Sequence, residues 1–196
     1  MDHPIYALHL FAGAGGGLLA DIIGGETVPV CAVEIEKYPQ QVLAARFPGL
    51  AIWDDVTTFR ADNPECAGMF DDLRQVAQEL VIAGGFPCQD ISCAGKGAGI
   101  RGARSGLWAE YARIIREIRP RYVFVENSPM LTSRGLGRVL GDLAALRYNA
   151  CWGVLSAESM GARHKRERIW ITAIADADCT RQLQPRRAFA QQRRRP

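Results

Sequence analysis

Cys88 is well placed to do chemistry, because it follows an apolar run with the length of a buried strand. The run Leu80-Val81-Ile82-Ala83 leads into Gly84-Gly85-Phe86-Pro87-Cys88-Gln89. Ligands of open parallel sheets bind beyond the carboxyl ends of the strands, where a thiolate can attack a substrate. A free cysteine is also commonly a buried core residue. The motif alone leaves both roles open, and its surroundings decide between them.

A glycine loop and two acids near the N-terminus indicate a ligand site. The loop 12–17 follows an apolar run, and Glu34 ends the next run, 21 residues after Gly13. Such a loop aims helix N–H groups at a ligand, and such an acid binds ribose hydroxyls. The third glycine of a dinucleotide fingerprint comes one place early, with Leu18 in its position. Asp55, after a third short run, is placed to meet a base amine. An adenosine-type ligand without phosphate suits this set; the alternative is a plain tight turn with surface acids.

The elements that must position these residues alternate between strand and helix along the chain. Strands are expected at 5–11, 28–33, 51–53, 80–83, 122–125, 149–155 and 169–175, and helices at 18–23, 37–47, 107–118 and 136–146. Residues 60–72 are expected to form a loop, and 92–106 a long functional loop. This alternation predicts an α/β fold, a doubly wound and mostly parallel sheet with helices on both faces.

Length and composition are those of an ordinary globular chain. The 196 residues are 48% hydrophobic, which allows one domain with a real core. The sequence has no apolar stretch of about 18 residues and no signal peptide, so no membrane span and a cytoplasmic location are expected. Six cysteines without a C-x-x-C pair argue against structural zinc and disulfides, and we expect reduced thiols.

The positive charge is local rather than general. Net charge is +3, but residues 180–196 hold six arginines and no acid, which leaves 18 basic and 21 acidic side chains in the rest. Two small basic clusters flank the candidate site and either contact phosphates or form a solvated face. They are Lys96, Arg101 and Arg104, then Arg163, Lys165, Arg166 and Arg168.

Five short motifs follow one another between Ile5 and Thr172. They are Phe11-Ala12-Gly13-Ala14-Gly15-Gly16 with Glu34, Asp55-Val56, Gly85-Phe86-Pro87-Cys88-Gln89, Glu126-Asn127, and His164-Lys165-Arg166-Glu167-Arg168. In type, order and approximate spacing they resemble the motifs of the cytosine-5 DNA methyltransferase family. The resemblance implies the Rossmann-like methyltransferase fold with an antiparallel last strand, S-adenosylmethionine as cofactor without a metal, and DNA as the partner.

The resemblance also implies a role for each site residue. Cys88 would add to carbon 6 of a flipped cytosine, Glu126 would contact N3 and the exocyclic amine, and Arg168 would contact O2. Positive charge from Arg166 or Arg168 would favour the thiolate. Ser92 and Arg104 would contact DNA from a lid at 92–106. The cofactor-binding residues implied are Phe11, Gly13, Gly15, Glu34, Ile35, Asp55, Val56, Pro87 and Leu107.

The sequence departs from the family pattern at three places. His164 stands where glutamine is usual, and Ser128 where valine is common. The family continues with a target-recognition domain and a returning segment, whereas we expect a catalytic domain at 1–175 and a basic, disordered tail at 176–196. The chain would then be a catalytic half that works with a second chain carrying the target-recognition domain, a truncated fragment, or a remnant.

Three functions compete at this point. The first is a DNA (cytosine-5) methyltransferase, and the second is a module that binds cofactor or DNA without turnover. The third, a nucleotide-dependent oxidoreductase, leaves Cys88, Glu126 and Arg168 without a purpose and conflicts with the early third glycine.

Overall fold

A single seven-stranded sheet forms the centre of the molecule, in the order β3-β2-β1-β4-β5-β7-β6. The computed structural model describes residues 4–87 and 107–176. The first five strands are parallel, and β7 runs antiparallel to both of its neighbours. The strands are β1 (Ile5–Leu10), β2 (Thr27–Val33), β3 (Ala51–Trp53), β4 (Leu80–Gly84), β5 (Tyr122–Asn127), β6 (Tyr148–Leu155) and β7 (Arg168–Ala175). The α/β fold with an antiparallel last strand is confirmed.

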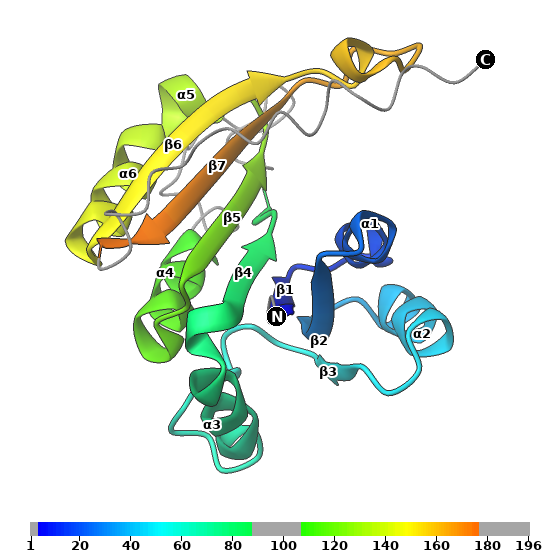
Figure 1. Cartoon of the computed structure of the whole chain (residues 1–196), viewed down its shortest axis with the longest axis vertical. Helices are drawn as coiled ribbons and strands as arrows, with labels where there is room; N and C mark the ends of the chain where they lie inside the picture. The colour runs from blue at the N-terminus through cyan, green and yellow to red at the C-terminus, as the bar shows by residue number, and fades with distance from the viewer. Residues whose placement is uncertain (1–3, 88–106, 177–196) are drawn as a thin grey trace.

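Helices lie on both faces of the sheet, but they cover the two faces unequally. The helices are α1 (Gly16–Gly24), α2 (Lys37–Arg46), α3 (Ala67–Gln75), α4 (Leu107–Ile118), α5 (Leu131–Arg134) and α6 (Leu136–Ala145), with short 3-10 turns at η1 (Ala77–Glu79) and η3 (Glu158–Met160). Figure 1 shows α4, α5 and α6 on one side of the sheet and α1 and α2 on the other. The main core lies under α3, α4 and α6, whereas only Leu18, Ala32 and Leu43 form a buried cluster under α1 and α2.

The expected loop at 60–72 is partly wrong, because α3 begins within it at Ala67. Gly68, Asp71 and Asp72 weaken the local helical signal. Phe70 and Leu73 are nevertheless buried, and the ring of Phe70 lies 4.6 Å from that of Phe59. This packing against the rest of the core overrides the weak local preference for a helix.

A buried tyrosine ties together the two strands that lead to the candidate site. The Tyr111 hydroxyl of α4 lies 3.1 Å from both the Ile82 carbonyl of β4 and the Phe124 carbonyl of β5, and donates to them. Burial raises the pKa of Tyr111, so the hydroxyl remains a donor. The ends of β4 and β5 are therefore held in a fixed relation.

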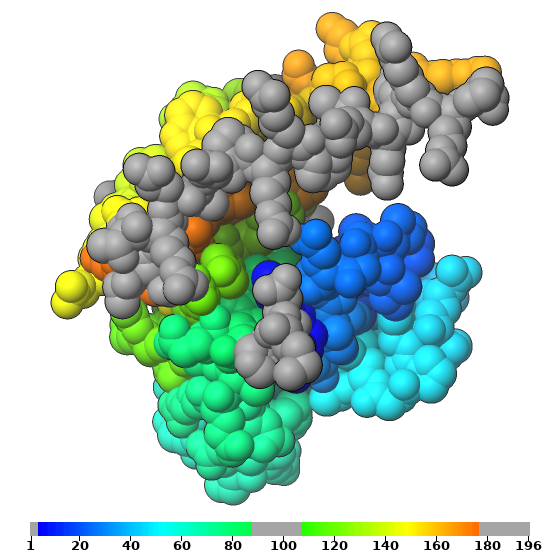
Figure 2. All heavy atoms as spheres, viewed as in Figure 1, coloured from blue at the N-terminus to red at the C-terminus, as the bar shows by residue number. Residues whose placement is uncertain are grey.

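The strands β6 and β7 extend beyond the rest of the sheet. In Figures 1 and 2 their connection, residues 156–167, projects past α1. Every residue of β6 after Tyr148 is exposed. Within residues 4–87 and 107–176, none of the helices has the length and apolar character needed to cross a bilayer.

Candidate functional site

The glycine loop and Glu34 are joined by backbone hydrogen bonds at the carboxyl ends of β1 and β2. The Gly13 N–H donates to Glu34 Oε2 at 2.6 Å, and the Glu36 N–H donates to Glu34 Oε1 at 2.8 Å. Glu34 is only 8% exposed. Gly13 and Gly15 have φ of 54° and 88°, a region that favours glycine. Two backbone amides, one from the glycine loop and one from Glu36, thus hold the Glu34 carboxylate in one orientation.

The remaining cofactor-binding candidates surround this acid on neighbouring elements. Ile35 follows Glu34 and is 63% exposed, while Val56 is buried. Phe11 is half-buried in a left-handed conformation with φ of 56°. Asp55 Oδ1 accepts from the amide and hydroxyl of Thr57, both at 2.8 Å. Among the described residues, Asp55 Oδ2 has no hydrogen-bond partner and is available to a ligand amine.

The nucleophile motif is described only as far as Pro87. Phe86 is buried, and its ring lies 5.5 Å from that of Trp108 in α4. The buried Asn127 side chain of β5 donates through Nδ2 to the Phe86 carbonyl at 3.0 Å. Pro87 and Leu107 are both half-buried, at either end of the gap in the description. Cys88, Ser92 and Arg104 lie outside the described residues.

The structure brings Glu126 and Arg168 together. Arg168 Nε lies 2.6 Å from Glu126 Oε1, and each side chain is one-third exposed. Glu126 is near the end of β5 and Arg168 begins the antiparallel β7, two segments that the sheet joins. The acid and the cation therefore share the edge of the sheet toward which β4 carries the chain to Cys88.

Arg166 does not join this pair. It is exposed, has φ of 38°, and makes no ion pair with an acid among the described residues. Its help to the Cys88 thiolate stays a prediction, because Cys88 lies outside the described residues. Of the two arginines in the motif, Arg168 is the one held against the acid.

Two residues of the motifs have positions that the sequence analysis did not assign. A Cβ at Gly85 would lie 2.5 Å from Glu126 Oε2, so glycine makes room for the carboxylate. Asn127 links the ends of β5 and β4 through Phe86. In the sequence, the roles of Gly85 and Asn127 are signalled only by their places inside the nucleophile motif and the Glu126-Asn127 motif.

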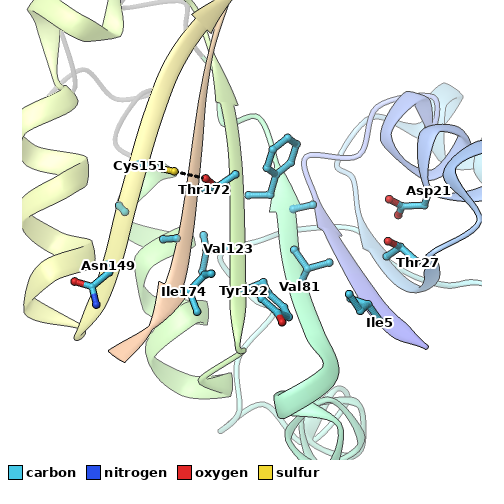
Figure 3. Close-up of a pocket in the computed structure, with 14 residues that line it drawn as sticks. Ile5, Asp21, Thr27, Val81, Tyr122, Val123, Asn149, Cys151, Thr172 and Ile174 are labelled. Carbon is cyan, nitrogen blue, oxygen red and sulfur yellow. Dashed lines mark hydrogen bonds between the residues drawn. The ribbon is translucent and has the colours of Figure 1, made fainter. Parts of the chain in front are cut away.

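A separate apolar groove of about 540 Å³ crosses the sheet face that α4 and α6 leave open. It runs from Ile5 of β1 across Val81 of β4 to β6 and β7 (Figure 3). Cys151 Sγ and Thr172 Oγ1, 2.9 Å apart, line its far side, joined by the dashed line in Figure 3. Glu126 and Arg168 do not line this groove. No group of three metal-ligating side chains occurs among the residues that the structure describes.

The comparisons with known proteins agree with this geometry. The family model described as "C-5 cytosine-specific DNA methylase" matches residues 5–194. The type II methyltransferase M.CviJI of Paramecium bursaria Chlorella virus IL3A is 35% identical over 85% of this chain and 42% of its own length. M.HhaI of Haemophilus parahaemolyticus is 33% identical over 84% of this chain and 47% of its own. The chain thus spans about half the length of these relatives.

The solved structure of the Dnmt2 methyltransferase of S. pombe has the same fold. It superposes with a TM-score of 0.70 over 89% of this chain and 50% of its own, at 20% identity. At this identity the likeness supports the fold alone.

Proposed function

Because the chain belongs to the C-5 cytosine-specific DNA methylase family, we propose that it is the catalytic part of a DNA (cytosine-5) methyltransferase. The observation that carries the proposal is the Glu126–Arg168 pair, 2.6 Å apart. It lies at the end of β5, beside the strand that leads to Cys88. An acid that gives a proton and a cation at that place can stabilise the negative charge that a cytosine ring gains when a thiolate adds to it.

The residues around the glycine loop fit S-adenosylmethionine, which supplies an electrophilic methyl group when it is bound. Each Glu34 oxygen already accepts one amide, and a carboxylate oxygen can accept a further hydrogen bond from a ribose hydroxyl. Asp55 offers Oδ2 to the adenine amine, and exposed Ile35 offers an apolar surface to the base. Phe11, Gly13, Gly15, Val56, Pro87 and Leu107 complete the proposed cofactor site.

Cys88 is the proposed nucleophile. Its thiolate adds to carbon 6 of cytosine, and the electron pair of the C5–C6 bond makes carbon 5 nucleophilic. After carbon 5 has gained a methyl group, its proton passes to water acting as a base, the electrons of that C–H bond re-form the C5–C6 double bond, and Cys88 leaves carbon 6 as a thiolate.

Glu126 and Arg168 stabilise the charge that this addition creates. Glu126, protonated when the base is bound, donates its proton to N3 and accepts from the exocyclic amine, while Arg168 contacts O2. Because Arg168 Nε is bonded to Glu126 Oε1, the other oxygen, Oε2, remains for the base. Positive charge from Arg168, with Arg166 nearby in sequence, favours the thiolate form of Cys88.

The target cytosine must be flipped out of the DNA, because its carbon 6 cannot be reached in a stacked duplex. Ser92 and Arg104 are the proposed contacts to the DNA, on the segment 92–106 that closes over the flipped base. We place the protein in the cytoplasm of a prokaryotic or phage-infected cell, since its relatives include bacterial and viral methyltransferases.

Turnover is proposed to need a further part that carries target recognition, in a second chain or in a longer form of this one. The relatives are about twice as long as the matched region. The open apolar groove on β1, β4, β5, β6 and β7 supports the same view, because sheets of this kind have helices on both faces. The catalytic domain at 1–175 and the basic tail at 176–196 would then be one half of the enzyme.

The test is a trapped covalent complex with DNA that contains 5-fluorocytosine. Fluorine at carbon 5 prevents the final elimination, so an enzyme that has transferred a methyl group stays bound through its cysteine. We expect an adduct in the presence of S-adenosylmethionine and of the neighbouring open reading frame, and none with Cys88→Ser. If no adduct forms with or without the protein encoded by that reading frame, the proposed catalytic activity is wrong and a binding module remains. A competition experiment between S-adenosylmethionine and NAD for the cofactor site distinguishes a methyltransferase or a binding module from an oxidoreductase.

A further inference from the structure

Arg113 reaches from the middle of α4 to the loop that follows β3. Its side chain is 13% exposed. Nη2 donates to the carbonyls of Val56 and Phe59, both at 2.9 Å. Two acids of the same helix fix the guanidinium, because Nε is 2.7 Å from Glu110 Oε2 and Nη1 is 2.9 Å from Glu117 Oε1. Four donor contacts therefore hold one side chain in a single position.

Glu117 adds a third bond between α4 and the same loop. Its Oε2 accepts from the Ala61 N–H at 3.1 Å, while Oε1 accepts from Arg113. The bonds from α4 to residues 56, 59 and 61 span sequence separations of 54 to 57 residues. These three bonds from α4 thus fix the backbone of the loop that follows β3.

The loop needs such support because its own strand is short. β3 has three residues, lies at the edge of the sheet and pairs only with β2. Asp55 starts the loop, and its carbonyl accepts from the amides of Thr58 and Phe59, both at 3.0 Å. The Phe59 carbonyl in turn accepts from Arg113. A shift of Phe59 would therefore move the turn that orients Asp55.

We propose that Arg113 is a positioning residue for the cofactor, holding the 55–61 loop so that Asp55 meets the exocyclic amine of the adenine. This inference rests on the proposed function, since it assigns adenine to the Asp55 side of the site. Arg113 touches the loop backbone and acts through Asp55. Lysine cannot replace it, because an ammonium is a point charge and cannot make four bonds in a fixed plane.

The test compares two ligands that differ only at the adenine amine. S-adenosylhomocysteine carries the amine, and the analogue with purine in place of adenine has a hydrogen atom there, so it has no donor for the Asp55 carboxylate. We expect the wild-type full chain to prefer the adenosyl ligand about tenfold in Kd by calorimetry, the value of one good hydrogen bond. Arg113→Lys should reduce this preference to about twofold to threefold.

Three further variants control the result. Asp55→Asn should lower the preference as Arg113→Lys does, and the double variant should go no lower, because both act on one contact. Arg116→Lys, an exposed cation on the same helix, should keep the wild-type preference. If Arg113→Lys does not fold, Glu117→Gln provides the test, because it removes the charge and keeps an acceptor for Ala61.

The inference is overturned if Arg113→Lys keeps the wild-type preference, or if it lowers Tm and weakens both ligands equally. The first result would mean that Asp55 is oriented without Arg113, and the second that Arg113 is only structural. A wild-type chain that binds both ligands without preference also overturns it and leaves the proposed function intact. A wild-type chain that binds neither ligand contradicts the proposed function itself.

Discussion

The two ends of the sheet's carboxyl edge are built in different ways. On the cofactor side, Glu34 is 8% exposed and is held by two backbone amides of its own neighbourhood. On the base side, Glu126 and Arg168 are each one-third exposed and hold each other by one ion pair between β5 and β7. The first arrangement is fixed by the local backbone, and the second by two side chains brought together by the sheet.

This difference indicates separate duties. A buried, amide-bound carboxylate is preorganised to bind a ligand, while a partly exposed ion pair can exchange partners when a base arrives. Substitutions on the two sides should therefore affect different measurements: cofactor affinity on one side and the rate of covalent addition on the other.

The largest effect is expected from Glu126→Gln. It removes the acid that we propose contacts N3 and breaks the ion pair with Arg168, so the rate of adduct formation at saturating cofactor should fall by about 10² to 10³. Cofactor Kd should stay within about twofold. Glu167→Gln, a change at an exposed acid next to Arg168 in the fifth motif, is the matched control. An equal loss of cofactor affinity in Glu126→Gln would break the separation of duties.

Glu34→Gln should have the opposite profile. Loss of the charge weakens the bond to Gly13 and the proposed bonds to ribose hydroxyls, and we expect cofactor Kd to rise by about 10- to 100-fold. The rate of adduct formation at saturating cofactor should change little. Glu36→Gln is the control, since its side chain is exposed and only its backbone contacts Glu34. Unchanged affinity in Glu34→Gln would place the ribose elsewhere.

Gly85→Ala should slow adduct formation about tenfold without a matching loss of stability. The new Cβ would lie 2.5 Å from Glu126 Oε2 and push the carboxylate out of position. Gly137→Ala, on α6 with open space around it, should raise stability by about 0.5 to 1 kcal/mol and leave the rate unchanged. Full activity in Gly85→Ala would show that the carboxylate moves freely.

Cys31 in β2 provides a reference thiol for Cys88. Burial raises the pKa of Cys31 from 9.0 to about 12. A raised folded-state pKa contributes stability that is present below pH 9 and is lost as the pH rises toward 12. Between pH 8 and 10 the free energy of unfolding should fall by about 1 kcal/mol more in wild type than in Cys31→Val, measured by urea denaturation. Identical pH profiles would contradict this account of the buried thiol.

The sheet and most helices could be predicted because their signals are local. Apolar runs such as Leu80–Gly84 have strand length, and α4 buries Trp108, Tyr111, Ile115 and Ile118 at helical spacing. The helix α3 was missed because its burial depends on Phe59, which lies just outside residues 60–72. A pattern within residues 60–72 does not contain that contact.

In the candidate site, too, the local motifs could be predicted from the sequence, whereas contacts between distant segments could not. The motifs predicted the candidate residues Glu34, Glu126 and Arg168 from their types and order. The ion pair itself depends on the pairing of β5 with β7, and the role of Gly85 depends on how close Glu126 approaches it. The contact of Arg113 with the 55–61 loop has no signal in the sequence, because the two backbone carbonyls that it binds there are more than 50 residues away.

The position of the methyl group on the product nucleoside is the most direct test of the central claim. Cofactor with a labelled methyl group, DNA and the chain with its complementing part would be incubated, and the DNA digested and analysed by mass spectrometry. Addition by Cys88, assisted by Glu126 and Arg168, predicts 5-methylcytosine from wild type and none from Cys88→Ser. Label on an exocyclic amine, or 5-methylcytosine made by Cys88→Ser, would contradict the account.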